Sequence, residues 1–337
     1  MVTNFSEKAN FIWSIADLIR DTFKRGQYQD VILPLTVLRR IDQVLEPTKA
    51  RVLETYHEYK DRLATLPDGL LRKASGYAFY NTSTYTFERL LADPANLADN
   101  LRQYINSFSP NMREVIEKFN FDNTLSRLDE AGLLYLVMER FKGVDLHPDR
   151  VPNEEMGYIF EELIRKFNEA LNENPGEHFT PREVIRLMVS LLVSPDRESL
   201  STPHIIRTVA DPCCGTGGML IIDKGAIEEI NPRADVHLFG QEVNPETYAV
   251  CKSDLYMKSA DGATLRTSCS AVRCPATDTL ASASTTSWPI RRTARTGRWT
   301  ETQWSGRPSE VTPGALARVL PASATGNCSS CSICSRE

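Results

Sequence analysis

The sequence predicts an α-helical amino-terminal region followed by a doubly wound, Rossmann-like α/β domain that is incomplete after its second strand. Apolar residues recur at helical spacing through residues 1–150. Farther along, the apolar run 204–209 leads to Asp211 and a glycine-rich turn, and a second strand-like stretch ends near Glu242. Doubly wound domains hold small charged cofactors at such a turn, directly after the first parallel strand.

The helices of the first region can be proposed in order. Ser6 is a candidate N-cap for a helix whose apolar residues extend to Phe23. The periodicity predicts further helices over 31–44, 97–108, 112–119 and 130–141. Arg39 and Arg40 fit a solvated helix face, with phosphate contact as the alternative. Glycine and proline in residues 143–152 indicate a linker.

The second region combines helical and strand patterns. A helix is expected over 156–171, a loop over 173–176, and a helix from Arg182 to Leu192 that begins after Pro181. A strand–turn–helix–strand unit over 204–243 and a helix over 245–257 follow. The turn reads D-P-C-C-G-T-G-G, which departs from the G-x-G-x-x-G of dinucleotide sites. Cys213 and Cys214 are expected to be small apolar fillers beside it.

Composition narrows the class of protein. The chain has 337 residues and a formal net charge of −5, so any DNA binding would need a local basic groove or a partner subunit. It has no apolar run long enough to cross a membrane and no secretory signal pattern, which predicts a cytoplasmic protein without a membrane partner. Its eight cysteines do not argue for secretion.

The character of the sequence changes after Lys258. Lys, His, Phe, Tyr and Met do not occur in residues 259–337, where Ser, Thr, Ala, Arg and Cys dominate. Such a composition cannot easily form an apolar face that offsets the entropy of ordering it, which predicts an aberrant, disordered tail. Cys328, Cys331 and Cys334 have the spacing of metal ligands, but three thiols without a histidine make a metal site a poor prediction.

Five blocks in the same order resemble the modification subunit of type I restriction-modification systems, a family of N6-adenine-specific DNA methyltransferases. They are residues 28–42, 156–167, 176–184, 209–220 and 238–245. The resemblance extends from the amino terminus to about Lys258. It implies three segments: a helical domain (1–150), the cofactor-binding half of a methyltransferase domain (151–258) and the tail (259–337).

The resemblance implies S-adenosylmethionine as cofactor and DNA as substrate. It also implies a separate specificity subunit and a restriction subunit as partners. The segment before the first strand would close over the cofactor, the turn would hold its methionine part, and Glu242 would hold its ribose. The implied cofactor residues are Glu177, His178, Phe179, Thr180, Pro181, Arg182, Asp211, Pro212, Cys213, Gly215, Thr216, Gly217, Gly218 and Glu242. No metal ligand is implied.

The catalytic N-P-P-Y motif of this family does not occur in the chain, so no catalytic residue is assigned. Codons for residues 284–300 can be chosen so that the same nucleotides, read one base earlier, encode F-D-Y-L-L-A-N-P-P-Y-G-K-D-W-K-M-D. Residues 327–335 similarly yield Q-L-L-F-L-Q-H-M-L. We interpret the tail as the methyltransferase gene in a shifted frame, which predicts an inactive chain.

Two alternatives remain open at the level of sequence. The first is a non-catalytic interaction module, in which residues 1–150 bind the specificity subunit. The second, weaker alternative is a metal protein that uses the cysteines of the tail.

Overall fold

The computed structural model describes residues 3–60, 67–171 and 180–258, with the side chains from residue 7 onward. Beyond Lys258 it describes the backbone of four short strands. The chain divides into the units Met1–Glu301 and Thr302–Glu337, and the second unit lies outside the described residues. The expected loop 173–176 and the segment Glu177–Phe179 lie outside them as well.

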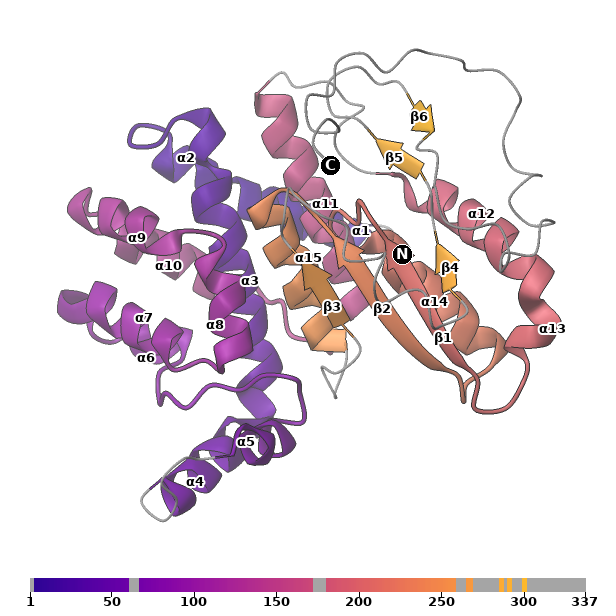
Figure 1. Ribbon diagram of the computed structural model, residues 1–337. Coiled ribbons are helices and arrows are strands. Elements are labelled where there is room, and N and C mark those ends of the chain that lie inside the picture. Colours follow the sequence, from indigo (N-terminus) through magenta and orange to yellow (C-terminus); the bar gives the residue numbers. More distant parts are fainter. Residues whose placement is uncertain are drawn as a thin grey trace, which may run out of the picture. The chain divides into compact units, whose positions relative to one another are not determined.

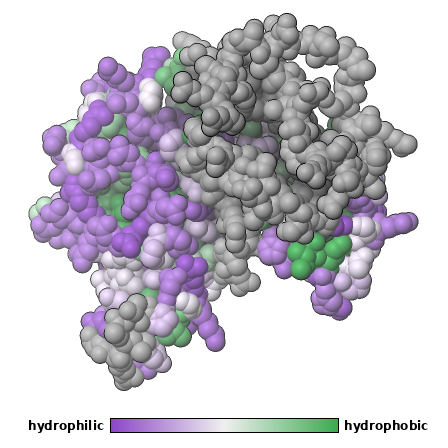
Figure 2. All heavy atoms as spheres, in the orientation of Figure 1, coloured by the Kyte–Doolittle hydropathy of each residue, from purple (hydrophilic) through white to green (hydrophobic). Residues whose placement is uncertain are grey.

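The first half of the chain is helical, as its apolar periodicity predicts (Figure 1). Its helices are α1 (Thr3–Trp13), α2 (Ile15–Ile19), α3 (Gln29–Leu45), α4 (Lys49–Tyr59), α5 (Asp68–Ser75), α6 (Phe87–Leu91), α7 (Leu97–Asn106), α8 (Pro110–Glu117), α9 (Phe121–Glu130) and α10 (Leu134–Lys142). Hydrophilic residues cover most of the visible face of α6–α10 (Figure 2). These helices therefore bury one apolar side each.

Three details of the helical prediction are wrong. Ser6 lies inside α1, which already begins at Thr3, so it is not an N-cap. Glu130 ends α9 instead of starting the next helix, because Gly132 adopts a positive φ of 66° and breaks the helix before α10. Arg40 is fully buried instead of solvated, because it donates to the carbonyls of Leu146 and Val151 in the linker.

The α/β part follows the linker, and its elements agree with the predicted order. They are α11 (Asn153–Ala170), α12 (Arg182–Val193), α13 (Arg197–Leu200), β1 (Ile206–Asp211), α14 (Gly218–Ile230), β2 (Asp235–Gln241) and α15 (Pro245–Lys258). β1 and β2 pair in parallel, with Ile206 opposite Asp235 and Asp211 opposite Gly240. A parallel pair joined by a helix is the elementary unit of a doubly wound fold.

The parallel sheet extends beyond its first two strands. β3 (Leu265–Ser268) pairs with β2, and β4 (Thr285–Ser287) pairs with β1, which gives the order β3-β2-β1-β4. β5 (Ile290–Arg292) and β6 (Trp299–Glu301) form an antiparallel pair. The open edge of a strand offers unpaired N–H and C=O groups that accept backbone of any composition. Composition alone therefore did not indicate β3 and β4.

Strand order identifies the position at which such a sheet binds ligands. The chain moves from β1 to β2 and β3 in one direction, and β4 lies on the opposite side of β1. The carboxyl ends of β1 and β4 therefore flank a topological switch point, where open α/β sheets bind their ligands. The glycine-rich turn after Asp211 starts at this point.

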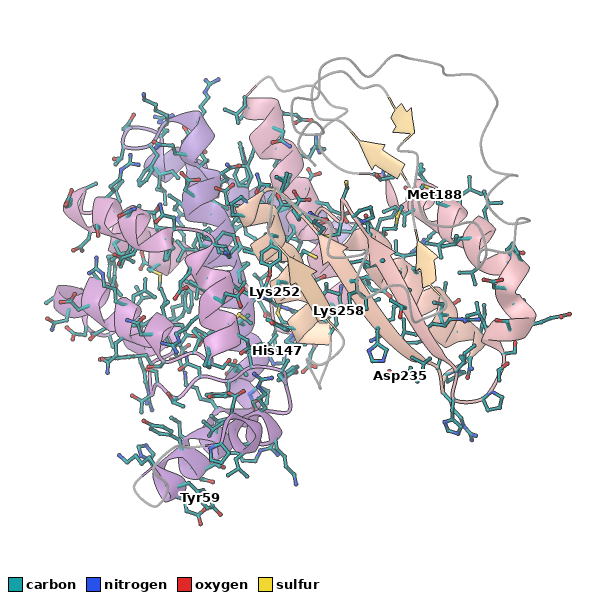
Figure 3. All side chains as sticks on the ribbon, viewed as in Figure 1. Tyr59, His147, Met188, Asp235, Lys252 and Lys258 are labelled. Carbon is teal, nitrogen blue, oxygen red and sulfur yellow. The ribbon has the colours of Figure 1, made fainter. Side chains whose placement is uncertain are left out.

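Helix α15 contributes to the two larger of the three hydrophobic clusters in the described part of the chain. Ala249 and Val250 belong to the cluster of the helical region, whereas Cys251 and Leu255 belong to the cluster around β1, β2, α12 and α14. Lys252, labelled in Figure 3, donates from α15 to Glu114 on α8 at 3.1 Å. Packing is therefore continuous across residue 150, and the three-segment division stays a prediction.

Candidate cofactor site

Asp211 ends β1 with its carboxylate directed at the turn that follows. Its Oδ1 accepts a hydrogen bond from the backbone N–H of Cys213 at 2.9 Å, and the residue is 9% exposed. Burial raises the pKa of Asp211 to about 6, and the nearby charge of Glu242 adds to the rise. The bond from Cys213 opposes it. A carboxylate in this position keeps one oxygen available to accept from a bound ligand.

Glu242 follows β2 and joins the two strand ends. Its Oε2 accepts from the backbone N–H of Gly215 at 3.0 Å, and its Oε1 accepts from that of Asn244 at 2.8 Å. The N–H of Cys214 donates to the carbonyl of Gln241 at 2.9 Å. The sequence predicted that Asp211, Gly215 and Glu242 belong to one site, and the structure brings them together.

Two glycines of the turn have backbone conformations or contacts that other residues tolerate poorly. Gly215 has a φ of 54° and Gly217 a φ of 82°, in the left-handed region. A Cβ on Gly217 would also lie 2.7 Å from Sγ of Cys251 on α15. The turn therefore lies directly on α15, and its half-buried residues Pro212, Gly215 and Thr216 leave backbone within reach of a ligand.

The two cysteines of the turn differ. Cys214 is buried, as expected of a filler, and a hydrogen bond with Cys251 followed by burial raises the pKa of its thiol well above the ordinary value. Such a thiol stays protonated and is a poor nucleophile. Cys213 is exposed, so the prediction that it fills space was wrong. It directly follows Pro212 on the outer side of the turn, where no core is available to cover it.

The segment that was expected to close over the cofactor is described only from Thr180 onward. Thr180 is half-buried and Pro181 is exposed just before α12, which runs over Arg182–Val193 and confirms the helix predicted there. Arg182 is buried, and its guanidinium donates to both carboxylate oxygens of Glu161 on α11 at 3.0–3.2 Å. Its charge is thus already paired within the protein.

Glu161 is the main residue near the site that the sequence did not indicate. Burial raises its pKa, and the hydrogen bonds from Arg182 oppose that rise. Its side chain lies beside the first residue of α14, because a Cβ on Gly218 would be 3.3 Å from Glu161 Oε1. The only sequence signal was Gly157, four residues earlier on the same helix face, which leaves room for the Arg182 guanidinium.

The described part of the chain contains neither a membrane-spanning helix nor a cluster of metal ligands. None of its helices is long and apolar enough to cross a membrane. Within the same residues, three or more His, Cys, Asp or Glu side chains do not gather in an arrangement that would hold a metal ion. The cysteines Cys328, Cys331 and Cys334 fall outside the described residues.

Two family profiles match the chain in succession. The profile described as "HsdM N-terminal domain" matches residues 8–141, and the profile described as "N-6 DNA Methylase" matches residues 152–286. Together they take in both the helical region and the strand–turn–helix–strand unit. The second match contains the turn, Glu242 and the described part of the segment before α12.

Relatives with similar sequences are named as methylase subunits of type I restriction enzymes. The type I restriction enzyme MjaIX methylase subunit of Methanocaldococcus jannaschii is 24% identical over 275 residues, which cover 76% of this chain and 46% of that protein. The MjaVII methylase subunit of the same organism is 31% identical over 133 residues, or 32% of this chain and 21% of that protein. The chain thus spans about half the length of the first relative and about a fifth of the second.

Solved structures with a similar fold include a methyltransferase subunit. It is the methyltransferase subunit of a type I restriction-modification system from Streptococcus thermophilus, with a TM-score of 0.52 and 16% sequence identity. The match covers 79% of this chain and 58% of that one. At this identity the likeness establishes the fold: a helical region followed by a methyltransferase-like α/β domain.

Proposed function

We propose that this chain, which belongs to the methylase-subunit family of type I restriction-modification systems, contains in residues 151–258 the cofactor-binding half of an N6-adenine DNA methyltransferase. The observation that carries the proposal is the joined end of β1 and β2. There Asp211, the backbone of Gly215 and Glu242 lie together at the switch point of the sheet. This is the position at which doubly wound domains bind their ligands.

S-adenosylmethionine suits this site in charge and in its hydrogen-bonding groups. At Gly215 a Cβ would meet open space, so this glycine leaves room for a ligand beside the turn, and N–H groups at the start of α14 favour a carboxylate. The carboxylate of Glu242 accepts one N–H at each oxygen, which leaves lone pairs for ribose hydroxyls. Asp211 would face the cationic part of the cofactor, where a negative charge is favourable.

The proposed reaction is methyl transfer to adenine N6 in DNA. When bound, the cofactor supplies an electrophilic methyl group on a sulfonium. The protein would hold that group in line with the adenine nitrogen. This alignment lowers the entropic cost of bringing the two reactants together. The adenine would be flipped out of the duplex, as in other enzymes that modify bases.

We infer further that this chain, as written, does not complete the reaction, because the N-P-P-Y that binds the adenine in the family is missing from its sequence. In the shifted reading, F-D-Y-L-L overlaps residues 284–288, and N-P-P-Y follows after a single alanine. The backbone of 285–287 forms β4 beside β1. A motif that follows β4 would adjoin the turn that follows β1, which supports the frame-shift interpretation.

DNA, a specificity subunit and a restriction subunit are the proposed partners. The alternative function is a non-catalytic module that binds the specificity subunit through residues 1–150. Co-purification of the full chain with that subunit, in the absence of methyl transfer, would support it. Failure of the two to associate would exclude it.

Calorimetric titration of the full chain with S-adenosylhomocysteine tests the proposed function. We expect saturable binding of one ligand per chain, which an Asp211→Ala variant loses. A matched control is Asp196→Ala, an exposed carboxylate near the end of α12. Absence of binding by the unmodified chain would contradict the proposal.

A further inference from the structure

The first turn of α14 sets the direction of the backbone N–H groups at the candidate site. That turn starts at Gly218, directly after the left-handed Gly217. Beneath Gly218 lie Oε1 of Glu161 from α11 and Cδ1 of Ile185 from α12, at 3.3 and 3.7 Å from the position of a Cβ. The start of α14 therefore rests on a junction of two other helices, and a polar atom forms part of that support.

Glu161 cannot shift without breaking an ion pair. Its carboxylate and the Arg182 guanidinium are 7% and 6% exposed, and three N–H···O contacts of 3.0–3.2 Å join them. An isolated carboxylate at this depth would carry a large desolvation penalty, so it stays where its partner is. Asp254 and Lys258 on α15, themselves paired at 2.6 Å, also act on this carboxylate through their charges.

Arg182 is held in place from the other side as well. Its guanidinium lies 3.9 Å from the centre of the Tyr158 ring and occupies the space that a side chain at residue 157 would fill. It is also the residue that directly follows Thr180 and Pro181, the described end of the segment expected to cover the cofactor. The Glu161–Arg182 ion pair thus contacts the start of α14 at Gly218 and also holds the residue that follows Thr180–Pro181.

We propose that Glu161 and Arg182 are a positioning pair, which holds the start of α14 and the segment Thr180–Pro181 in a fixed relation and thereby sets the geometry of the cofactor site. The proposal rests on the proposed function for the identity of the ligand. It reassigns Arg182 from direct contact with the cofactor to a position behind it, and it adds Glu161.

Amide hydrogen exchange of the full chain without ligand tests the pair independently of cofactor binding. In Glu161→Gln and Arg182→Lys, we expect peptides that cover residues 180–185 and 211–220 to exchange at least about tenfold faster, while peptides from α3 exchange as in the unmodified chain. The matched control is Glu162→Gln, which breaks a more exposed ion pair with Arg165 on the same helix. Equal acceleration across the whole chain would overturn the proposal, since the pair would then be merely structural.

Titration with S-adenosylhomocysteine supplies the second measurement. We expect Glu161→Gln to weaken binding about tenfold and Arg182→Lys, which keeps the charge, to weaken it less. The double variant Glu161→Leu/Arg182→Met removes both charges, so it should unfold much like the unmodified chain yet still bind about tenfold more weakly. Unchanged affinity in this folded variant would contradict the proposal.

The two failures can be distinguished. If the unmodified chain does not bind S-adenosylhomocysteine, the proposed function is wrong, and the exchange pattern alone still decides whether the pair fixes the turn. If the unmodified chain binds and the pair variants bind equally well, the positioning role is wrong and the proposed function stands.

Discussion

Glu242, at the end of β2, accepts a hydrogen bond from the backbone N–H of Gly215, in the turn that follows β1, at 3.0 Å. This bond closes the gap between two neighbouring strand ends with a carboxylate that is only half-buried. The same carboxylate holds Asn244 on its other oxygen. Glu242 therefore stabilises the turn and is also proposed to bind the ligand. Both roles can be measured.

Replacing Glu242 by alanine should weaken both. Two backbone N–H groups lose a charged acceptor and turn to water, so we expect the free energy of unfolding to fall by about 1–2 kcal/mol. The affinity for S-adenosylhomocysteine should fall at least about tenfold. Glu242→Gln should have a stability and an affinity between those of the unmodified chain and Glu242→Ala. Chemical denaturation and calorimetry measure these effects. Glu198→Ala, an exposed carboxylate on α13, should change neither.

Asp211 should make the protein less stable as the pH rises. Its pKa is raised from 3.8 to about 6. The folded state therefore holds this proton more tightly than the unfolded state, and the stabilisation present below pH 3.8 is lost as the pH rises toward 6. Asp211→Asn removes the dependence, so its advantage in unfolding free energy should grow from pH 5 to pH 8 and reach at most about 3 kcal/mol. An advantage that is equal at both pH values would contradict the assignment.

The Asp211→Asn variant should also lose affinity for the cofactor, because the favourable charge is gone. A residue that lowers stability at neutral pH and raises affinity is typical of a functional site. Titration of the same protein samples at pH 8 measures this. Tighter binding by the variant would show that Asp211 is only a turn residue.

Gly217 and Gly225, both at or within α14, should respond in opposite ways to alanine. At Gly217 the positive φ and the 2.7 Å approach to Cys251 should together lower the free energy of unfolding by about 2 kcal/mol or more. At Gly225 a Cβ would meet open space within a helix, so alanine should stabilise by up to about 1 kcal/mol. Adding Cys251→Ala to the Gly217→Ala variant should recover part of the lost stability. Denaturation curves of the unmodified chain, the two glycine variants and this double variant measure these effects.

Arg40 should be among the most sensitive residues of the helical region. Its buried guanidinium donates hydrogen bonds to the carbonyls of Leu146 and Val151 and to Oδ1 of Asn153. Burial lowers the pKa of Arg40 to about 10. Arg40→Ala leaves these acceptors without partners and should lower the free energy of unfolding by about 3–5 kcal/mol. Arg20→Ala, at a side chain that is 66% exposed, should cost less than about 0.5 kcal/mol.

Much of the α/β part could be predicted because local chemistry marks its boundaries. Pro181 before α12 and the glycines before α14 fix helix starts, and the apolar runs before Asp211 and Glu242 identify β1 and β2. Asp211, Gly215 and Glu242 could be assigned to one site because parallel strand ends meet at one edge of a sheet. Their contact with a cofactor stays a prediction.

Other features depend on partners that are distant in sequence. The acceptors of Arg40 lie more than 100 residues away, so periodicity could only suggest a solvated face. The Glu161–Arg182 pair spans 21 residues and two helices in the same way. Between α9 and α10 the boundary has a local cause, the positive φ of Gly132, which apolar periodicity does not detect. Burial of charge is decided by packing, which a pattern of single residues does not contain.

The most direct test of the central claim is methyl transfer by two forms of the gene product, the chain as written and a form with one base restored between the codons of Lys258 and Cys274. Each would be purified with the specificity subunit and assayed with labelled S-adenosylmethionine and DNA. We predict that both bind S-adenosylhomocysteine and that only the restored form labels adenine N6. Methyl transfer by the chain as written, or no transfer by a folded restored form, would contradict the account.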